Sequence, residues 1–211
     1  DIQTNKTIIC DSGGFQLSSG KEVWIDPEHL TDFYNVYVDE GVTLDIPIRT
    51  YNRELLVRML AVQKKNSKMI MEGLKPGIRL ANVAHGFDYQ DFTFVRERLW
   101  ENERMDILCI PSSRVLPDIK SIDRLLYHMT HGMEYKQYHL LGIYNMTWLS
   151  LAIKFIYEWN KTKGKNVLLT SDASSAIYSA SALRYHKQPM PYRSVSRWPI
   201  GLMAPISGPY N

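Results

Sequence analysis

Short apolar segments alternate with longer amphipathic segments along this chain of 211 residues. The short segments are predicted strands, at 7–11, 42–46, 78–84, 105–110, 138–143 and 166–171. Several are continuous apolar runs, which are typical of strands buried on both faces of a parallel sheet. The amphipathic segments are predicted helices, at 52–66, 90–102, 118–131, 147–161 and 173–186. This alternation predicts an α/β fold with a parallel sheet, either a barrel or a doubly wound sheet.

Polar residues at the ends of the predicted strands favour the barrel. These residues are Asp11, Asp45, His85, Asp172 and the segment 112–114. All strand carboxyl ends meet at one mouth in a TIM-type barrel, whereas a doubly wound sheet divides them about a switch point. About six strand–helix units are visible, fewer than in a complete (β/α)8 barrel. We therefore expect a (β/α)8 TIM-type barrel from which two units are missing.

The composition is that of an ordinary globular protein, with 45% hydrophobic and 22% charged residues. No low-complexity segment or linker divides the chain, so we expect a single domain over residues 1–211. No apolar run approaches the roughly 20 residues that cross a membrane. The net charge of +3 permits a nucleic-acid partner without arguing for one.

Both cysteines, Cys10 and Cys109, fall within predicted buried strands and are interpreted as small apolar core residues. Because no disulfide framework is indicated, a reducing cytoplasm is the expected location. The chain begins at Asp1 without an initiator methionine and shows no signal-peptide pattern. We therefore expect that an amino-terminal part precedes it.

The hexapeptide Asp11-Ser12-Gly13-Gly14-Phe15-Gln16 follows the first predicted strand. Its two glycines allow a sharp turn and the close approach of a flat ligand to the main chain. The hexapeptide resembles the signature of the tRNA-guanine transglycosylase family, whose members exchange a base in a nucleic acid. The resemblance implies that Asp11 is a general acid/base and that Ser12, Gly13 and Phe15 contact the substrate. It also implies that Asp11 ends the family's third strand, so that the missing units of the barrel are the first two. The alternative is a plain strand-to-turn junction in which Asp11 is a local cap.

Two further segments resemble motifs of archaeal members of this family. The segment 168–180 is similar to the strand end that carries the nucleophile, which implies that Asp172 attacks the ribose. Its alternative role is the N-cap of the helix that follows. The segment 44–47 is similar to LDIP, which implies that Asp45 binds the edge of a guanine-like base by a bidentate contact. Its alternative role is a strand-end aspartate before a proline turn.

The resemblance weakens at the next two strand ends. His85 and Gly86 occupy the start of the family's QGGxYxDL motif, with histidine in place of the glutamine that contacts the base carbonyl. His85 and Gly86 are expected to contact the base, although a buried, satisfied histidine is the alternative. The fourth unit is a poor match to GGLxVGE, because Pro111 removes a backbone donor. Ser112 is still expected at the base.

Basic residues are candidates for contacts to nucleic-acid phosphates. They are Arg114, Arg184, Lys187, Arg193 and Arg197. The last four lie in a carboxyl-terminal stretch that mixes basic and aromatic side chains, a mixture that suits phosphates and stacked bases. A solvated tail is the alternative for this stretch. The family's zinc motif, CxCxxC with a distant histidine, is absent from the sequence, so we expect neither zinc nor another cofactor.

The departures from the family pattern favour its phage and bacterial branch, which inserts 7-deazaguanines such as preQ0 into DNA through a covalent aspartyl-glycosyl intermediate. A tRNA-guanine transglycosylase of the queuine or archaeosine type is the alternative. The sequence is also compatible with a nucleosidase and with a non-catalytic nucleic-acid-binding paralogue or accessory subunit. We expect nucleic acid as partner, DNA rather than tRNA, and a homodimer or partner subunit. The expected location is the cytoplasm of a bacterial or phage-infected cell.

Overall fold

Six strands lie side by side in the order of the sequence, and each pair of neighbours is parallel. The computed structural model describes residues 7–13, 25–47, 50, 52–99, 101–112, 118–131, 135–143 and 145–172. The strands are β1 (Ile9–Cys10), β2 (Glu40–Val42), β3 (Arg79–Val83), β4 (Ile107–Pro111), β5 (Gln137–Leu141) and β6 (Leu168–Ser171). Parallel neighbours with a helix in each crossover confirm the predicted α/β class.

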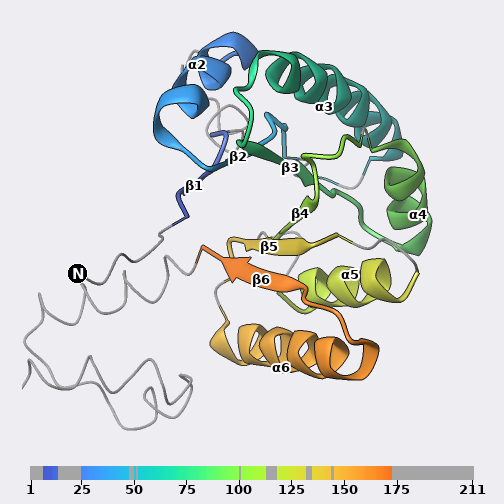
Figure 1. Ribbon diagram of the computed structural model, residues 1–211. Helices are drawn as coiled ribbons and strands as arrows, with labels where there is room; N and C mark the ends of the chain where they lie inside the picture. Colours follow the sequence, from blue (N-terminus) through green and yellow to red (C-terminus); the bar gives the residue numbers. More distant parts are fainter. Residues whose placement is uncertain are drawn as a thin grey trace, which may run out of the picture.

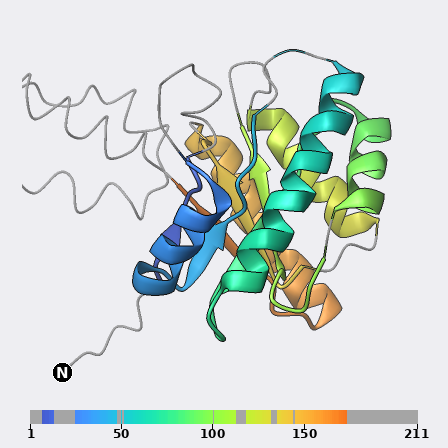
Figure 2. The same cartoon turned by 90° about the horizontal axis from the view of Figure 1, so that it is seen from above.

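The described helices all lie on the outer face of the sheet. They are α2 (Pro27–Tyr37), α3 (Arg53–Gly73), α4 (Tyr89–Arg98), α5 (Asp118–Thr130) and α6 (Met146–Lys163). Figure 1 shows the sheet curled into an open C with these helices around its convex side, and Figure 2 shows the helical layer from above. The strand order never reverses, as it would in a doubly wound sheet, so the described residues form a curled parallel half-barrel that is compatible with part of a TIM-like barrel. They do not form a complete barrel.

Strand β4 shows why the apolar runs are continuous. Ile107 and Cys109 belong to a cluster with Val42 and Ala81 on the concave face. Their neighbours Leu108 and Ile110 pack beneath the helices in a separate cluster, together with apolar residues of α3, α4, α5 and α6. Because successive side chains of a strand point to opposite faces, a strand covered on both faces needs apolar residues at every position.

Several elements differ from the sequence prediction: α3 ends at Gly73, beyond the predicted 66, and α4 ends at Arg98, before the predicted 102. Helix α2 was not expected, although Asp26 caps its first turn by accepting from His29 N at 2.8 Å and Pro27 occupies its first position. Strand β2 spans 40–42, not 42–46. The apolar character of 42–46 comes from an irregular segment, because Leu44 is buried in the core beyond the last paired residue.

The sheet ends in weakly covered edge strands. Cys10 is only partly buried, contrary to prediction, because β1 is an edge strand of two residues. Ile8 and Leu168, next to and within the two edge strands, are 54% and 51% exposed. The predicted helix 173–186 lies outside the described residues. None of the described helices has both the length and the apolar character needed to cross a membrane.

Candidate active site

The carboxyl ends of the parallel strands bring the polar residues predicted from the sequence to one edge of the sheet. Asp11 directly follows β1, Ser112 directly follows β4 and Asp172 directly follows β6. Asp45 and His85 lie within three residues of the ends of β2 and β3. In a TIM-like barrel this edge is the mouth where chemistry takes place.

Asp45 and His85 form a buried pair at the mouth. His85 Nε2 lies 2.7 Å from Asp45 Oδ2, and the side chains are only 9% and 8% exposed. An ionised carboxylate only accepts hydrogen bonds, so Nε2 donates and Asp45 fixes the orientation of the imidazole ring. Because one of its oxygens already accepts from His85, Asp45 is less available for the predicted bidentate contact with a base.

Asp11 begins a tight turn whose amides face its own carboxylate. Ser12 N donates to Asp11 Oδ1 at 2.8 Å, and Gly13 follows with a φ of 75°. Asp11 keeps an exposed surface, yet surrounding protein atoms displace part of its water and raise the pKa of its carboxyl. The negative charges of Asp45 and Asp172 raise this pKa further, whereas hydrogen bonds from backbone amides lower it. The charges of Asp45 and Asp172, which also follow strand carboxyl ends, therefore act on Asp11.

Asp172 is held by the neighbouring strand end. Gly142 N, directly after β5, donates to Asp172 Oδ1 at 2.5 Å. Gly142 has a φ of 69°, and a Cβ there would lie 3.2 Å from Ser112 O, so a larger residue would disturb both the turn and the end of β4. Asp172 keeps an exposed surface, yet surrounding protein atoms displace part of its water and raise the pKa of its carboxyl.

Four small residues also lie at the described part of the mouth: Ser12, Gly86, Ser112 and Gly142. Ser12 and Gly86 are buried, and Ser112 N donates to Leu141 O at 2.7 Å. Gly142 was missed by the sequence reasoning, which assigned no chemistry to its strand. Its signal was present as a glycine near the end of the predicted strand 138–143, because a glycine there allows the backbone to turn and direct its amide toward the mouth.

A buried arginine behind the mouth was also missed. Arg124, in α5, is 0% exposed and donates to Gly86 O and, at 3.1 Å, to Pro111 O. Burial lowers the pKa of Arg124 to about 10, so the guanidinium stays charged at neutral pH. No sequence pattern distinguished Arg124, because a lone arginine in an amphipathic helix is normally solvated.

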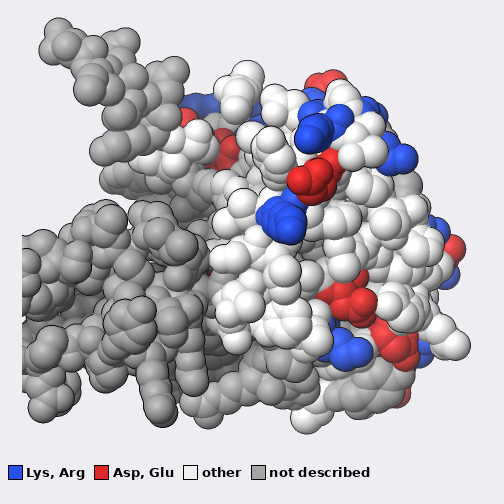
Figure 3. All heavy atoms as spheres, turned by 90° about the horizontal axis from the view of Figure 1, so that it is seen from below, with Lys and Arg blue, Asp and Glu red and all other residues white. Residues whose placement is uncertain are grey.

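The remaining candidates lie outside the described residues and stay predictions. They are Phe15, Arg114, Arg184, Lys187, Arg193 and Arg197. On the face of the molecule shown in Figure 3, Lys and Arg are interspersed with Asp and Glu and gather into no field of one sign. Among the residues that the structure describes, no group of three or more His, Cys, Asp or Glu could hold a metal ion.

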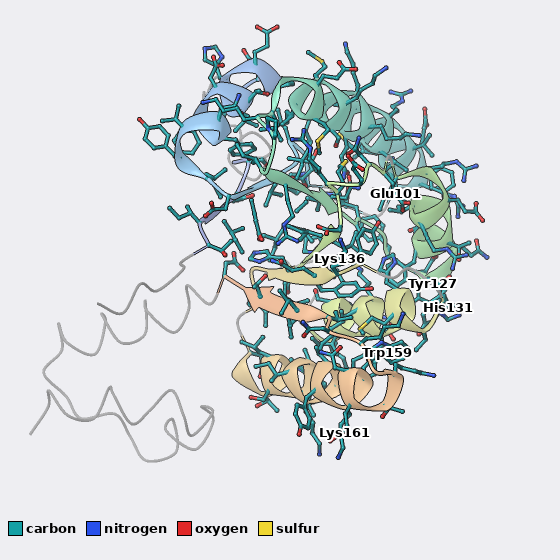
Figure 4. All side chains as sticks on the ribbon, in the orientation of Figure 1. Glu101, Tyr127, His131, Lys136, Trp159 and Lys161 are labelled. Carbon is teal, nitrogen blue, oxygen red and sulfur yellow. The ribbon has the colours of Figure 1, made fainter. Side chains whose placement is uncertain are left out.

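A groove of about 450 Å³ lies elsewhere, between α4 and α5 on the outer helical layer. It is lined by Tyr89, Asp123, Leu126, Tyr127, Thr130 and His131. Tyr127 and His131 stack with ring centroids 4.1 Å apart, and Figure 4 shows both at the outer end of α5. No strand contributes to this groove, so it is separate from the mouth.

A known archaeal protein is similar to this chain. A tRNA-guanine(15) transglycosylase from Methanococcus aeolicus is 28% identical over an alignment of 138 residues, and the match covers 58% of this chain. The chain spans only 19% of the length of that relative. No family model matches the chain. The similarity agrees with the resemblance stated from the motifs, and it concerns a part of the relative and not its whole length.

Proposed function

We propose that this chain carries the catalytic face of a guanine transglycosylase that acts on a nucleic acid. The observation that carries the proposal is the gathering of Asp11, Asp45 and Asp172 at the carboxyl ends of separate strands. Base exchange needs a nucleophile, a proton carrier and a group that recognises the base, and carboxylates suit all three tasks. The similarity to a tRNA-guanine(15) transglycosylase supports the same reaction class.

In the proposed reaction Asp172 attacks C1′ of the target nucleotide. A carboxylate oxygen forms a bond to C1′ as the bond from C1′ to the base breaks, and the base leaves with that electron pair and a proton from Asp11. The incoming base returns a proton to Asp11 and attacks C1′, which releases Asp172. Two displacements at one carbon retain its configuration, as in retaining glycosidases.

The environments of the two carboxylates suit these roles. Gly142 N holds Asp172 at one oxygen and helps to keep it ionised, as a nucleophile must be. Asp11 lies near two other negative charges, and its raised pKa favours a carboxyl that is able to carry a proton. Asp45 and His85 are the proposed base-binding pair.

We further propose DNA as the acceptor and a 7-deazaguanine as the incoming base. The departures from the pattern of the tRNA enzymes favour this choice: histidine at position 85, phenylalanine at position 87 in place of the second glycine of QGGxYxDL, and Pro111. The alternative is tRNA, which the name of the similar archaeal protein favours. Residues 1–211 are proposed to form one barrel-type domain without a cofactor.

The test is incorporation of radiolabelled guanine or preQ0 into duplex DNA and, separately, into bulk tRNA. Label in DNA alone is the expected result. Label in tRNA alone would support the transglycosylase but overturn the DNA acceptor. Label in neither, together with retained binding of nucleic acid, would favour the non-catalytic paralogue. Release of free base without incorporation would identify a nucleosidase.

A further inference from the structure

The peptide bond between Gly86 and Phe87, one residue beyond His85, is held from both sides by buried ionised side chains. Its carbonyl, Gly86 O, accepts from the Arg124 guanidinium. Its amide, Phe87 N, donates to Asp91 Oδ2 at 3.0 Å. Arg124 and Asp91 are both 0% exposed, and they come from different helices, α5 and α4.

We propose that Arg124 and Asp91 act as a clamp on the Gly86–Phe87 peptide, and that through it they position His85 and its partner Asp45. A peptide carries a dipole whose negative end is the carbonyl and whose positive end is the amide. The clamp places the Arg124 cation at the negative carbonyl of this peptide and the Asp91 carboxylate at its positive amide. Rotating the peptide would reverse both contacts in a buried site, where mismatched charges are most costly.

Glycine at position 86 explains why a clamp is needed. Gly86 has a φ of 156°, and a Cβ there would lie 2.6 Å from the ring of Phe92, so only glycine fits. Glycine leaves the backbone unusually free to rotate. The same Phe92 ring lies 5.2 Å from the Arg124 guanidinium, which fixes the arginine above it.

The clamp also reaches the next strand end. Arg124 donates to Pro111 O at 3.1 Å, and Ser121 Oγ donates to the same carbonyl at 2.8 Å. Pro111 is the last residue of β4, directly before Ser112. One buried guanidinium therefore joins the ends of β3 and β4 at the mouth. Arg124 and Asp91 are positioning residues, because each acts on the site through the backbone.

The base-binding test rests on the proposed function. Arg124→Met and Asp91→Leu each remove one side of the clamp, and we expect Arg124→Met to reduce kcat/KM for the free base by about 10- to 100-fold, mainly through KM. Asp91→Asn, which keeps an acceptor for Phe87 N, is expected to restore most of the loss caused by Asp91→Leu. Arg96→Met is the matched control, because Arg96 also donates to a carbonyl, His131 O at 2.8 Å, on the outer surface.

A double-mutant cycle separates positioning from general stability. If Arg124 acts through His85, Arg124→Met should change the Kd for guanine by less than about twofold when His85 is already alanine. An undiminished effect in that background, or an equal loss in Arg96→Met, would overturn the proposal. If Arg124→Met does not fold, Arg124→Lys keeps the charge but not the fork of donors and is tested in the same cycle.

Amide hydrogen exchange tests the clamp even if the proposed function fails. Exchange of the Phe87 amide, measured by NMR on the intact chain, should be at least about tenfold faster in Asp91→Leu and in Arg124→Lys than in the wild type, and unchanged in Arg96→Met. Equal exchange rates in all four proteins would overturn the clamp. Faster exchange in a chain that never exchanges a base would retain the clamp and reject the transglycosylase.

Discussion

The two ends of the concave face of the sheet differ in whether their charged side chains are paired with an opposite charge. At the amino-terminal end Arg79 donates to Glu40 and, at 2.9 Å, to Asp106, while Gln137 joins Arg79 and Glu40. At the carboxyl end Asp11 has no cation within ion-pair distance among the described residues, and its negative neighbours raise its pKa.

This difference indicates that the two ends serve different purposes. A paired charge network lets the first residues of β2, β3 and β5 meet inside the barrel without an unpaired ion. Carboxylates kept close to one another destabilise the fold but are ready to take up or release a proton. The amino-terminal end therefore supports the fold, and the mouth carries the proposed chemistry.

The largest predicted effect is at Asp172. Asp172→Ala should lower base exchange by about four orders of magnitude, because it removes the proposed nucleophile. It should also abolish the covalent adduct between enzyme and nucleic acid, detected as a band shift on a denaturing gel. Folding should be retained, since Asp172 is exposed. Adduct formation by Asp172→Ala at the wild-type level would show that Asp172 is not the nucleophile and would contradict the catalytic role proposed for the mouth.

The next effect tests the amino-terminal end. Arg79→Leu leaves Glu40, whose side chain is 4% exposed, without its cation, and should lower the free energy of unfolding by about 3–5 kcal/mol. Urea unfolding measures this change. Arg58→Leu is the control, because Arg58 pairs with Glu54 at 2.6 Å but is 71% exposed, and it should cost less than about 1 kcal/mol. Equal losses in the two variants would contradict a supporting role for the network.

A histidine between the two ends should make the fold sensitive to acid. Burial lowers the pKa of His139 to about 4, while the charge of Glu40 opposes the shift. The unfolded chain takes up a proton near pH 6.5, which the folded chain does only near pH 4, so stability is lost as pH falls through this window. The contribution of His139 to this loss in the free energy of unfolding is about 3 kcal/mol.

His139→Gln should remove this part of the acid loss while keeping a polar group near Thr170 Oγ1, which lies 2.8 Å from His139 Nδ1. Urea unfolding at pH values from about 7 to about 4 checks the change. Identical pH profiles for the variant and the wild type would show that His139 does not set the acid sensitivity.

The smallest effect is expected at Asp11. Because the pKa of Asp11 is higher in the folded chain than in the unfolded chain, ionisation of this carboxyl lowers the free energy of unfolding. This loss of stability begins as pH rises past the ordinary pKa of the carboxyl. Asp11→Asn should therefore raise Tm by a few degrees at most at neutral pH, and the gain should disappear in acid. Because Asp11 is exposed, solvent keeps the effect small. A lower Tm at neutral pH would show that Asp11 stabilises the fold.

The sequence predicted the order of most elements well and their limits less well. Continuous apolar runs placed β3, β4, β5 and β6 within about two residues of their observed bounds, because strands covered on both faces leave that pattern. The apolar run at 42–46 led to a wrong strand prediction, because Leu44 is buried in the core although it is not paired in the sheet. Helix α2 was overlooked although Asp26 and Pro27 mark its start.

The sequence by itself determined the alternation of strands and helices and the polar residues that follow five of the six strands, since both depend on local pattern and composition. The tertiary structure decided which of those residues meet. It brought His85 within hydrogen-bond distance of Asp45 and the Gly142 amide within hydrogen-bond distance of Asp172. It also placed Arg124 and Asp91 at the two ends of the Gly86–Phe87 peptide. Most of these contacts join residues far apart in the chain, and only the packing of helices against a curled sheet brings their atoms within hydrogen-bond distance.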